Sequence, residues 1–293
     1  MTETRHSAEP SPLSIGQCAT LACLLEATAS KPGNVHRGAD FEDLRFEQFV
    51  VSAVAIAPAM EKAASSGVGP AILEAVKATQ SWAQTNTNLG TLLLIAPLAA
   101  VPRSKTLAAG IGEVLASLTP ADSAAVYEAI RRAHPGGMGQ VSEMDIAGPA
   151  PPSLLEAMRA ASQRDLVARQ YGNGFAEAIA EVPSLLMAAI LATGDLPQGI
   201  IHSQLQFLHR HPDSLIARKA GLHAAEHASW QAGQVLQSGP PGSSDYQGAL
   251  ADFDFWLRSD GHRRNPGTTA DLIAAGLFVV LREGLLKPPI QWP

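Results

Sequence analysis

The sequence contains few cysteines, few aromatic residues and few charges. Of its 293 residues, two are cysteine, 5% are aromatic and 16% are charged. Cys18 and Cys23 lie five residues apart in one predicted helix, so their side chains do not face each other as a pair. A disulfide framework and a zinc site of several cysteines are therefore excluded. This pattern is typical of a reducing compartment, and we expect a cytoplasmic protein.

The sequence also lacks a hydrophobic run that is long enough for a membrane helix. The most apolar stretch, Leu89 to Val101, is shorter than the about 20 residues required, and Pro97 interrupts it, so it predicts a buried core helix. Residues 1–12 are polar and lack the apolar segment of a secretory signal. We predict a flexible tail there and a single domain over 13–293, with no membrane partner.

Charge gives no indication of a nucleic-acid partner. The formal net charge is −6, whereas a protein that binds nucleic acid usually carries a concentrated basic face. We therefore expect no nucleic-acid partner.

Helical periodicity dominates the chain. Apolar residues recur at three- and four-residue spacing, and the alternating runs that indicate strands are nearly absent. The predicted helices span residues 46–64, 71–82, 123–133, 153–182, 198–209, 213–236, 246–257 and 268–282. We predict an all-α fold, a single domain of roughly ten helices. Asp271 is expected in the first turn of the last helix, where a carboxylate suits the helix dipole.

Two polar loops interrupt the apolar helices near opposite ends of the chain. Residues 31–36, Lys-Pro-Gly-Asn-Val-His, follow an apolar helical run, and Pro32 and Gly33 predict a tight turn there. Residues 265–271, Asn-Pro-Gly-Thr-Thr-Ala-Asp, form a second loop of similar composition. Two such loops favour a site that is assembled from distant segments.

The first loop and the residues after it carry charges of both signs. Lys31 and Arg37 could hold phosphate oxygens, and Asp40 and Asp43 could hold a divalent metal ion through oxygen ligands. A solvated surface loop is the alternative interpretation, because short motifs of this kind have low specificity.

Three further segments carry weaker signals. Asn88 at the start of the most apolar helix is explained by helix capping, although helix amides at this turn would also suit a phosphate. The glycine-rich residues 134–139 fit either a flap over a site or an ordinary loop. His223, Glu226 and His227 have the spacing of one class of zinc peptidases, but a mixed polar helix face is the simpler explanation.

Five ordered segments together resemble the triphosphoribosyl-dephospho-coenzyme A synthase family. These are Glu26 with Lys31-Pro32-Gly33, then Gly38 with Asp43-Leu44, then Asn86-Thr87 with Gly90, then Asp213 through Lys219 to Gly221, and finally Asn265-Pro266-Gly267 with Ala270-Asp271-Leu272. The resemblance implies an all-helical enzyme that transfers the triphosphoribosyl group of ATP to dephospho-coenzyme A and releases adenine.

The chain departs from the pattern of this family at several positions. His36 stands where the family usually has an aspartate, and Phe41 where it has a histidine. Asn88 and Leu89 replace a histidine and a lysine, and Lys219 stands near a position of arginine. These departures resemble a divergent branch linked to tetrahydromethanopterin-dependent one-carbon metabolism.

The resemblance implies glycosyl transfer at a ribose anomeric carbon, with nearby carboxylates stabilising the positive charge that develops there. It suggests three catalytic candidates: Glu26, Asp43 and Asp271. It suggests Mg²⁺ as cofactor, held by Asp43, Asp213 and Asp271. Candidate contacts to substrate or phosphate are Lys31, Asn34, His36, Asn86, Asn88, Arg218, Lys219, Asn265 and Thr268.

Two other functions stay open at this point. The first is a phosphoribosyltransferase that uses phosphoribosyl diphosphate in tetrahydromethanopterin biosynthesis, which the missing lysine at position 89 favours. The second is a non-catalytic ligand-binding protein that kept the fold. The expected partners are a nucleotide or phosphoribosyl donor and a small-molecule acceptor, and the sequence is compatible with a homo-oligomer.

Overall fold

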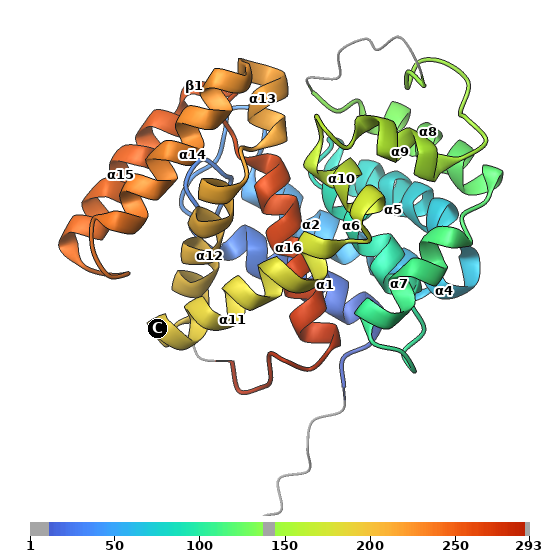
Figure 1. The fold of residues 1–293 in the computed structure, drawn as a ribbon, viewed down its shortest axis with the longest axis horizontal. Helices are drawn as coiled ribbons and strands as arrows, with labels where there is room; N and C mark the ends of the chain where they lie inside the picture. The colour runs from blue at the N-terminus through green and yellow to red at the C-terminus, as the bar shows by residue number, and fades with distance from the viewer. Residues whose placement is uncertain (1–11, 137–143, 291–293) are drawn as a thin grey trace, which may run out of the picture.

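Helices make up nearly all of the regular structure. The computed structural model describes residues 12–136 and 144–290, which contain sixteen α-helices, one π-helical turn and one four-residue strand (Figure 1). Their bounds are α1 Ile15–Thr28, α2 Phe46–Ala55, α3 Ala57–Glu61, α4 Ala63–Ser66, α5 Val68–Ala83, α6 Leu89–Ala100, α7 Leu107–Ala116, α8 Pro120–Ala133, α9 Leu154–Ala161, α10 Leu166–Asn173, η1 Glu177–Glu181, α11 Val182–Thr193, α12 Leu196–Arg210, α13 Ser214–Ala220, α14 Leu222–Gln237, α15 Ser244–Arg258, β1 Ser259–His262 and α16 Gly267–Arg282.

The predicted all-α fold is confirmed, but the predicted number of roughly ten helices is too low. Long periodic stretches are divided where the backbone must turn. Residues 213–236 form two helices because Gly221 between them has φ of +93°, a conformation that favours glycine. Residues 153–182 are divided at Asp165, which caps α10, and again at Gly174 with φ of +74°. The predicted tail lies almost wholly outside the described residues.

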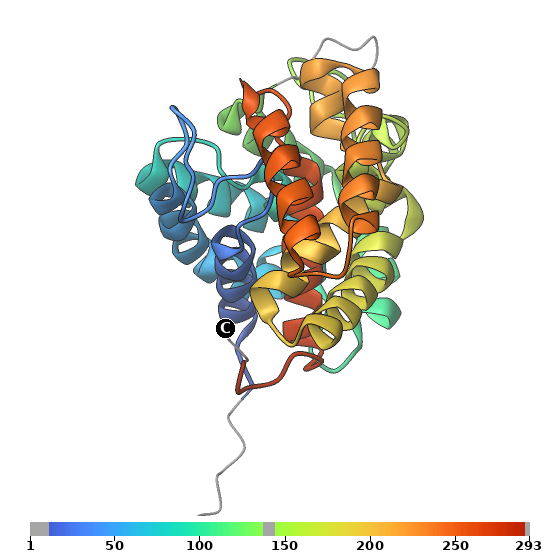
Figure 2. The ribbon, with the colours of Figure 1, turned by 90° about the vertical axis from the view of Figure 1, so that its left-hand side faces the viewer.

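Helix α16 runs through the centre of the fold (Figure 1) and packs against α1, α6, α11 and α12. Residues 272–280 of α16 are all buried, as expected for a helix that is surrounded by others. Helix α6 is also almost entirely buried, which confirms the core helix predicted from its apolar run. On the side that faces the viewer in Figure 2, α14 and α15 pack against each other.

Within the described residues, no single helix has both the length and the apolar character to cross a membrane. Two consecutive segments, Leu166–Asn173 and Glu177–Thr193, reach this length and apolar character only when they are taken together, and the chain bends by 96° between them.

A buried carboxylate ties the starts of two helices together. Asp213 Oδ1 accepts hydrogen bonds from the backbone N–H groups of Leu215 (2.8 Å) and Ile216 (3.0 Å) in α13. Its Oδ2 accepts from the backbone N–H (2.7 Å) and the hydroxyl (2.8 Å) of Thr269 in α16. Both helix N-termini are therefore anchored on one side chain, which satisfies donors that a helix leaves unpaired at its first turn.

The next residue extends this junction to a third helix. Ser214 Oγ donates to Thr268 Oγ1 (3.1 Å) and accepts from the backbone N–H of Leu166 (3.2 Å). The N-termini of α10, α13 and α16 are thus held at one place, which in Figure 1 lies in the upper centre of the fold.

We predict that Asp213→Ala lowers the free energy of unfolding by about 3 kcal/mol or more, because it leaves several buried donors without a partner. Urea unfolding followed by circular dichroism measures this loss. Ser243→Ala is the matched control, since Ser243 makes a single capping bond to Tyr246 in α15 and its loss should cost only about 1 kcal/mol. Equal losses of unfolding free energy in the two variants would contradict the proposed role of Asp213 in holding the two helix N-termini.

Candidate active site

A cavity of about 640 Å³ opens where the helix N-termini meet. Its walls come from α1, α2, α6, α8, α9, α10, α13, β1 and α16, together with residues of the connecting segments 34–44, 86–88, 135–136, 144–146 and 164–165 and with Asn265. This volume is in the range of small-molecule sites. Every one of the five segments that carry the family resemblance contributes at least one residue to its lining.

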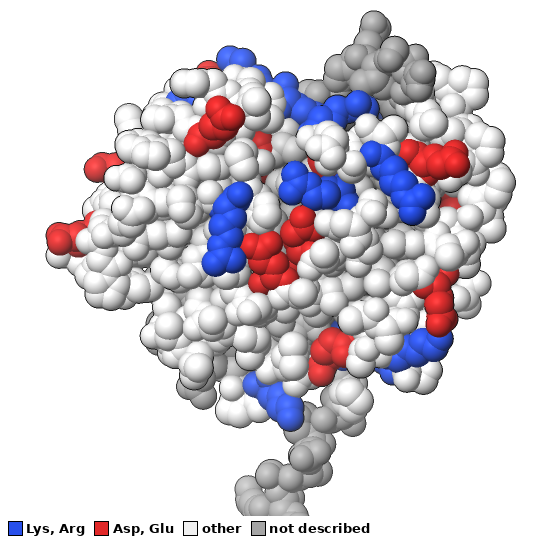
Figure 3. Space-filling view, in the orientation of Figure 1, with Lys and Arg blue, Asp and Glu red and all other residues white. Residues whose placement is uncertain are grey.

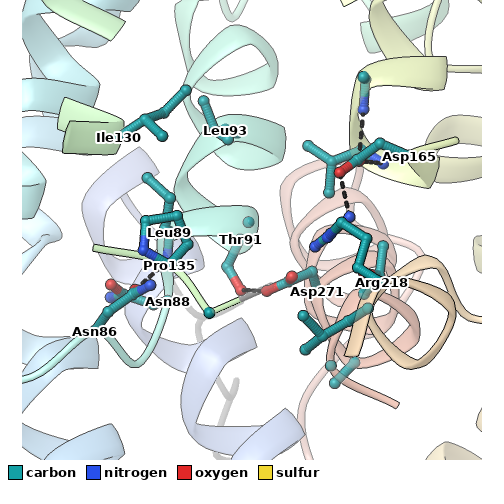
Figure 4. A pocket seen from close by; sticks show the side chains of 18 of the residues that line it. Asn86, Asn88, Leu89, Thr91, Leu93, Ile130, Pro135, Asp165, Arg218 and Asp271 are labelled. Atoms are coloured by element: carbon teal, nitrogen blue, oxygen red, sulfur yellow. Dashed lines mark hydrogen bonds and ion pairs between the residues drawn. The ribbon is translucent and has the colours of Figure 1, made fainter. Parts of the chain in front are cut away.

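Most of the predicted site residues line this cavity. They are Glu26, Asn34, Asn86, Asn88, Arg218, Lys219, Asn265, Thr268 and Asp271. Figure 4 shows Arg218 and Asp271 on one side of the cavity and Asn86 and Asn88 on the other. The predicted roles of these residues stay predictions, but the structure brings them to one place.

Asp271 lies in the second turn of α16, so the expected position in the first turn is wrong. Its carboxylate instead contacts the N-terminus of a different helix, α6. Oδ1 accepts a hydrogen bond from Thr91 Oγ1 (2.7 Å), and a Cβ atom added at Gly90 would lie only 2.0 Å from Oδ2. Residue 90 must therefore be glycine for Asp271 to reach the helix end.

Burial raises the pKa of Asp271 to about 7. The negative charges of Glu26 and Asp213 raise it further, while the hydrogen bond from Thr91 opposes the shift. Asp271 can thus gain or lose a proton near neutral pH, which is what general acid–base catalysis requires.

Glu26 lies in the last turn of α1 and reaches the same cavity. Its Oε1 pairs with Lys31 Nζ at 2.8 Å. Lys31 itself is fully buried and does not line the cavity, so the structure places this predicted phosphate contact behind Glu26. The tight turn predicted after Lys31 is confirmed, because Gly33 has φ of +74°.

Three side-chain amides form a network beside the carboxylates. Asn34 Nδ2 donates to Asn265 Oδ1 (3.1 Å), and Gln204 Nε2 donates to Asn34 Oδ1 (2.9 Å). The network joins both polar loops to α12. Sequence reasoning missed Gln204, although a glutamine among the apolar residues of a predicted helix was a usable signal.

The start of α6 is capped differently from the prediction. Asn88 occupies the N-cap position, but its side chain makes no capping bond, and Asn86 Oδ1 accepts from the backbone N–H of Leu89 (3.1 Å) instead. Asn88 Oδ1 accepts from Thr79 Oγ1 (3.3 Å). Its Nδ2 has no hydrogen-bond partner within the described part of the chain. Asn88 therefore lines the cavity while its buried Nδ2 is left unpaired within the described residues.

Arginine and lysine side chains lie at the mouth of the cavity. Arg218 Nη1 pairs with Asp165 Oδ2 at 2.5 Å, and Asp165 also caps α10. Lys219 is half-buried, and burial lowers its pKa. Arg164 lines the cavity too and is exposed. Figure 3 shows Lys and Arg side chains along the upper edge of the molecule, above α13 and toward α9.

The prediction missed Asp165 and Arg164. Both lie at the start of α10, a helix boundary that the long periodic stretch 153–182 concealed. An aspartate followed by an apolar run was the available signal, because Asp is a preferred N-cap residue.

The remaining predicted site residues lie outside the cavity lining. The imidazole Nδ1 of His36 accepts from the backbone N–H of Gly38 (3.1 Å), and burial lowers the pKa of His36. Asp43 is exposed and pairs with His262 (3.0 Å), which does line the cavity. Asp213 is buried in the helix junction.

One wall of the cavity is apolar. It is formed by α8, α9 and the middle of α6, with Leu93, Ile130, Leu154 and Met158 among its residues. The polar and apolar walls are suited to a ligand with a charged end and an apolar or aromatic end.

The described side chains can supply only one or two of the oxygen ligands that a Mg²⁺ ion needs. Among residues 12–136 and 144–290, no group of three His, Cys, Asp or Glu side chains lies close enough to hold a metal ion. The expected ligands Asp43, Asp213 and Asp271 therefore do not gather, and His223 with Glu226 and His227 forms no metal site. However, Mg²⁺ is usually held by one or two carboxylates together with substrate phosphates, and Glu26 and Asp271 supply such carboxylates.

Comparison with known proteins agrees with this geometry. The fold and the cavity define an all-helical protein with a cavity of the size found in small-molecule sites. The chain belongs to the ATP:dephospho-CoA triphosphoribosyl transferase family, whose profile matches residues 12–289. The implied family is thereby confirmed.

A solved structure supports the same assignment. It is a presumed triphosphoribosyl-dephospho-coA synthase from Archaeoglobus fulgidus, which is 25% identical and has a TM-score of 0.61. The match covers 80% of this chain and 98% of the other. None of the curated proteins compared with the chain matches it.

We predict that Asp271→Asn stabilises the ligand-free protein at alkaline pH. The pKa of Asp271 is about 7 in the folded chain and near 4 in the unfolded chain, so the folded state holds an extra proton between these values. Stability is then lost as the pH rises from about 4 to 7. Above pH 7 the variant should exceed the wild type by on the order of 2 kcal/mol.

Urea unfolding at pH 4.5 and pH 8 measures this difference. The gain should be present at pH 8 and nearly absent at pH 4.5. Asp195→Asn is the control, since Asp195 caps α12 outside the cavity lining and asparagine is an equally good cap. A stability gain of equal size at pH 4.5 and pH 8 would refute the raised pKa of Asp271.

Proposed function

We propose that this chain transfers a ribosyl polyphosphate group from ATP to a hydroxyl of dephospho-CoA or a related acceptor. The observation that supports this most is the arrangement of charge in one cavity. Two carboxylates, Glu26 and Asp271, lie at its base, while Arg218, Lys219 and helix N-termini surround its mouth. Such an arrangement suits a substrate with a sugar ring at one end and phosphates at the other.

The carboxylates suit glycosyl transfer. As the bond from the anomeric carbon to the adenine nitrogen breaks, the ribose ring gains positive charge, and an ionised carboxylate beside it stabilises that charge. The acceptor hydroxyl forms the new C–O bond and loses its proton to a general base. Asp271 fits this base because its pKa is about 7. The adenine leaves with the bonding electron pair and takes up a proton.

The mouth of the cavity suits phosphates. Arg218 lines the cavity, and its buried Nε has no hydrogen-bond partner in the described part of the chain. Arg218 and Lys219 bring positive charge, and arginine pairs with phosphate through two N–H groups. Mg²⁺ would be held by Glu26 or Asp271 together with phosphate oxygens and would neutralise part of the phosphate charge.

A transferase that uses phosphoribosyl diphosphate is the second candidate. Leu89 lines the cavity and brings no charge to the position where the resemblance expects a lysine. The cavity therefore lacks one cation that the resemblance places beside the triphosphate chain of ATP. The link to one-carbon metabolism, the cytoplasmic location and a homo-oligomer stay predictions.

We predict that the purified protein with Mg²⁺, ATP and dephospho-CoA releases adenine, which chromatography detects. Asp271→Asn should lower the rate at least about 100-fold, as expected for loss of a general base, with helicity unchanged. Diphosphate release from phosphoribosyl diphosphate, without adenine from ATP, would move the assignment to the second candidate. Binding of ATP without turnover under any condition would support a non-catalytic protein.

We predict that Arg218→Met weakens the binding of the donor, ATP, more than the binding of the acceptor, dephospho-CoA. The KM for ATP should rise about tenfold, since a charged hydrogen bond to phosphate contributes about 1.5 kcal/mol, while the KM for dephospho-CoA should change little. Arg210→Met is the matched control, because Arg210 also pairs with a carboxylate, Glu181, but does not line the cavity. An unchanged KM for ATP would show that Arg218 does not contact the donor.

A further inference from the structure

Gln204 of α12 is fully buried and lies behind the cavity wall, because it contacts Asn34 but does not itself line the cavity. Its Nε2 donates to two oxygens, Asn34 Oδ1 at 2.9 Å and the carbonyl of Pro32 at 3.4 Å. Its Oε1 has no hydrogen-bond partner among the described residues. The direction in which this side-chain amide faces is therefore set by the two acceptors that surround its NH₂ group.

The peptide unit between Pro32 and Gly33 is held from both sides. Its C=O accepts from Gln204 of α12, and its N–H donates to Asp254 Oδ1 of α15 at 2.7 Å. A carbonyl oxygen accepts hydrogen bonds and cannot donate them. If the Gln204 amide were reversed, its oxygen would face this carbonyl oxygen, and the two would repel each other. The fixed peptide therefore keeps the NH₂ group of Gln204 turned toward the first polar loop.

The direction of the Gln204 amide is passed on to Asn34 and Asn265. Asn34 presents Oδ1 to Gln204, so its Nδ2 lies on the other side and donates to Asn265 Oδ1 at 3.1 Å. A side-chain amide has one acceptor oxygen and one donor nitrogen, so its first member decides the polarity of a chain of amides. The chain ends at Asn265 Nδ2, which makes no hydrogen bond in the part of the chain that the structure describes.

Asn265 lines the cavity close to α13. A Cβ atom added at Gly267 would lie 3.2 Å from Asn265 Oδ1 and 2.6 Å from Leu215 of α13. Arg218 and Lys219 follow in the same helix and line the cavity too. An N–H donor near two cations suits an anionic oxygen, such as that of a phosphate group.

We propose that Gln204 is a positioning residue that turns the Asn34 and Asn265 amides, so that Asn265 Nδ2 donates a hydrogen bond to a phosphate oxygen of ATP. This inference deepens the proposed transfer reaction and rests on it for the identity of the nucleotide. With the opposite polarity, Asn265 would present its oxygen to the phosphate, and two acceptors would face each other. Gln204 thus acts on the ligand without touching it.

The test of the contact is a calorimetric titration of the full-length protein with Mg²⁺ and inorganic tripolyphosphate, repeated with ATP in place of tripolyphosphate. Asn265→Ala should raise the Kd for both probes about tenfold, as expected for loss of a hydrogen bond to a charged group. An effect on ATP without an effect on tripolyphosphate would place Asn265 at the ribose or the base and refute the phosphate contact. Failure of the wild type to bind either probe would refute it as well.

Gln204→Met tests the positioning role, because methionine has a similar volume but no N–H donor. The amides of Asn34 and Asn265 can then take either direction, so the Kd for tripolyphosphate should rise at least about twofold as the competent fraction falls to about half. In the Asn265→Ala background, Gln204→Met should leave that Kd unchanged, since the two residues act in series. An equal rise in both backgrounds would indicate a general packing effect and refute the proposal.

Gln170→Met is the matched control. Gln170 is also fully buried, and its Nε2 also donates to a backbone carbonyl, that of Leu166 (3.3 Å), and to a side-chain oxygen, Glu177 Oε2 (2.8 Å). Neither Gln170 nor these two partners line the cavity. The Kd for tripolyphosphate should therefore stay unchanged in Gln170→Met, and a rise equal to that of Gln204→Met would contradict the positioning role.

A second variant keeps the test decisive if Gln204→Met does not fold. In Asn34→Asp, residue 34 still accepts from Gln204 but can no longer donate, so the NH₂ group of Asn265 should turn toward it and away from the ligand. Asn34→Asp should then raise the Kd for tripolyphosphate by a larger factor in the wild-type background than in Asn265→Ala, where only the added charge acts. Equal factors in the two backgrounds would refute the relay.

Adenine release from ATP with dephospho-CoA is measured separately. Absence of release together with the predicted changes in Kd would overturn the proposed transfer and leave the positioning role supported. Release by the wild type together with an unchanged Kd in Asn265→Ala would refute the positioning role alone.

Discussion

The cavity depends on one buried carboxylate. Asp213 receives four hydrogen bonds, two from the start of α13 and two from Thr269 of α16. A helix N-terminus leaves donors unpaired, and burying several of them in one place would be costly without an acceptor. Because Asp213 meets this requirement, the first turns of two helices can be held together. Ser214 adds the start of α10, and the cavity lies where these ends meet.

The same geometry explains how negative and positive groups are separated within the site. Glu26 and Asp271 are held at the base of the cavity, where burial and mutual repulsion disfavour charge on Asp271. Arg218 and Lys219 project from α13 at its mouth. A ligand with a sugar and phosphates would therefore enter with its phosphates toward the cations. The raised pKa of Asp271 costs stability at neutral pH, as is common where a protein keeps a reactive group in its interior.

Part of the site was predictable because its residues lie in loops that break strong helical patterns. Proline and glycine mark both loops, and a turn of this kind places polar groups at helix ends. Lys31 shows the limit of this reasoning. Its position in a polar loop predicted a phosphate contact, yet its side chain returns to the end of α1 and pairs with Glu26. The sequence contains no local signal for that direction.

The sequence by itself determined the helical class, the core helix at Leu89–Ala100 and the loops that supply the site, because periodicity, glycine and proline act over a few residues. Only the tertiary structure decided which helix end each carboxylate meets. Asp271 was expected to serve its own helix but contacts the start of α6, which Gly90 leaves open. Thr91 and Asp271 are 180 positions apart, and their contact depends on how the helices pack. A local sequence pattern does not predict that packing.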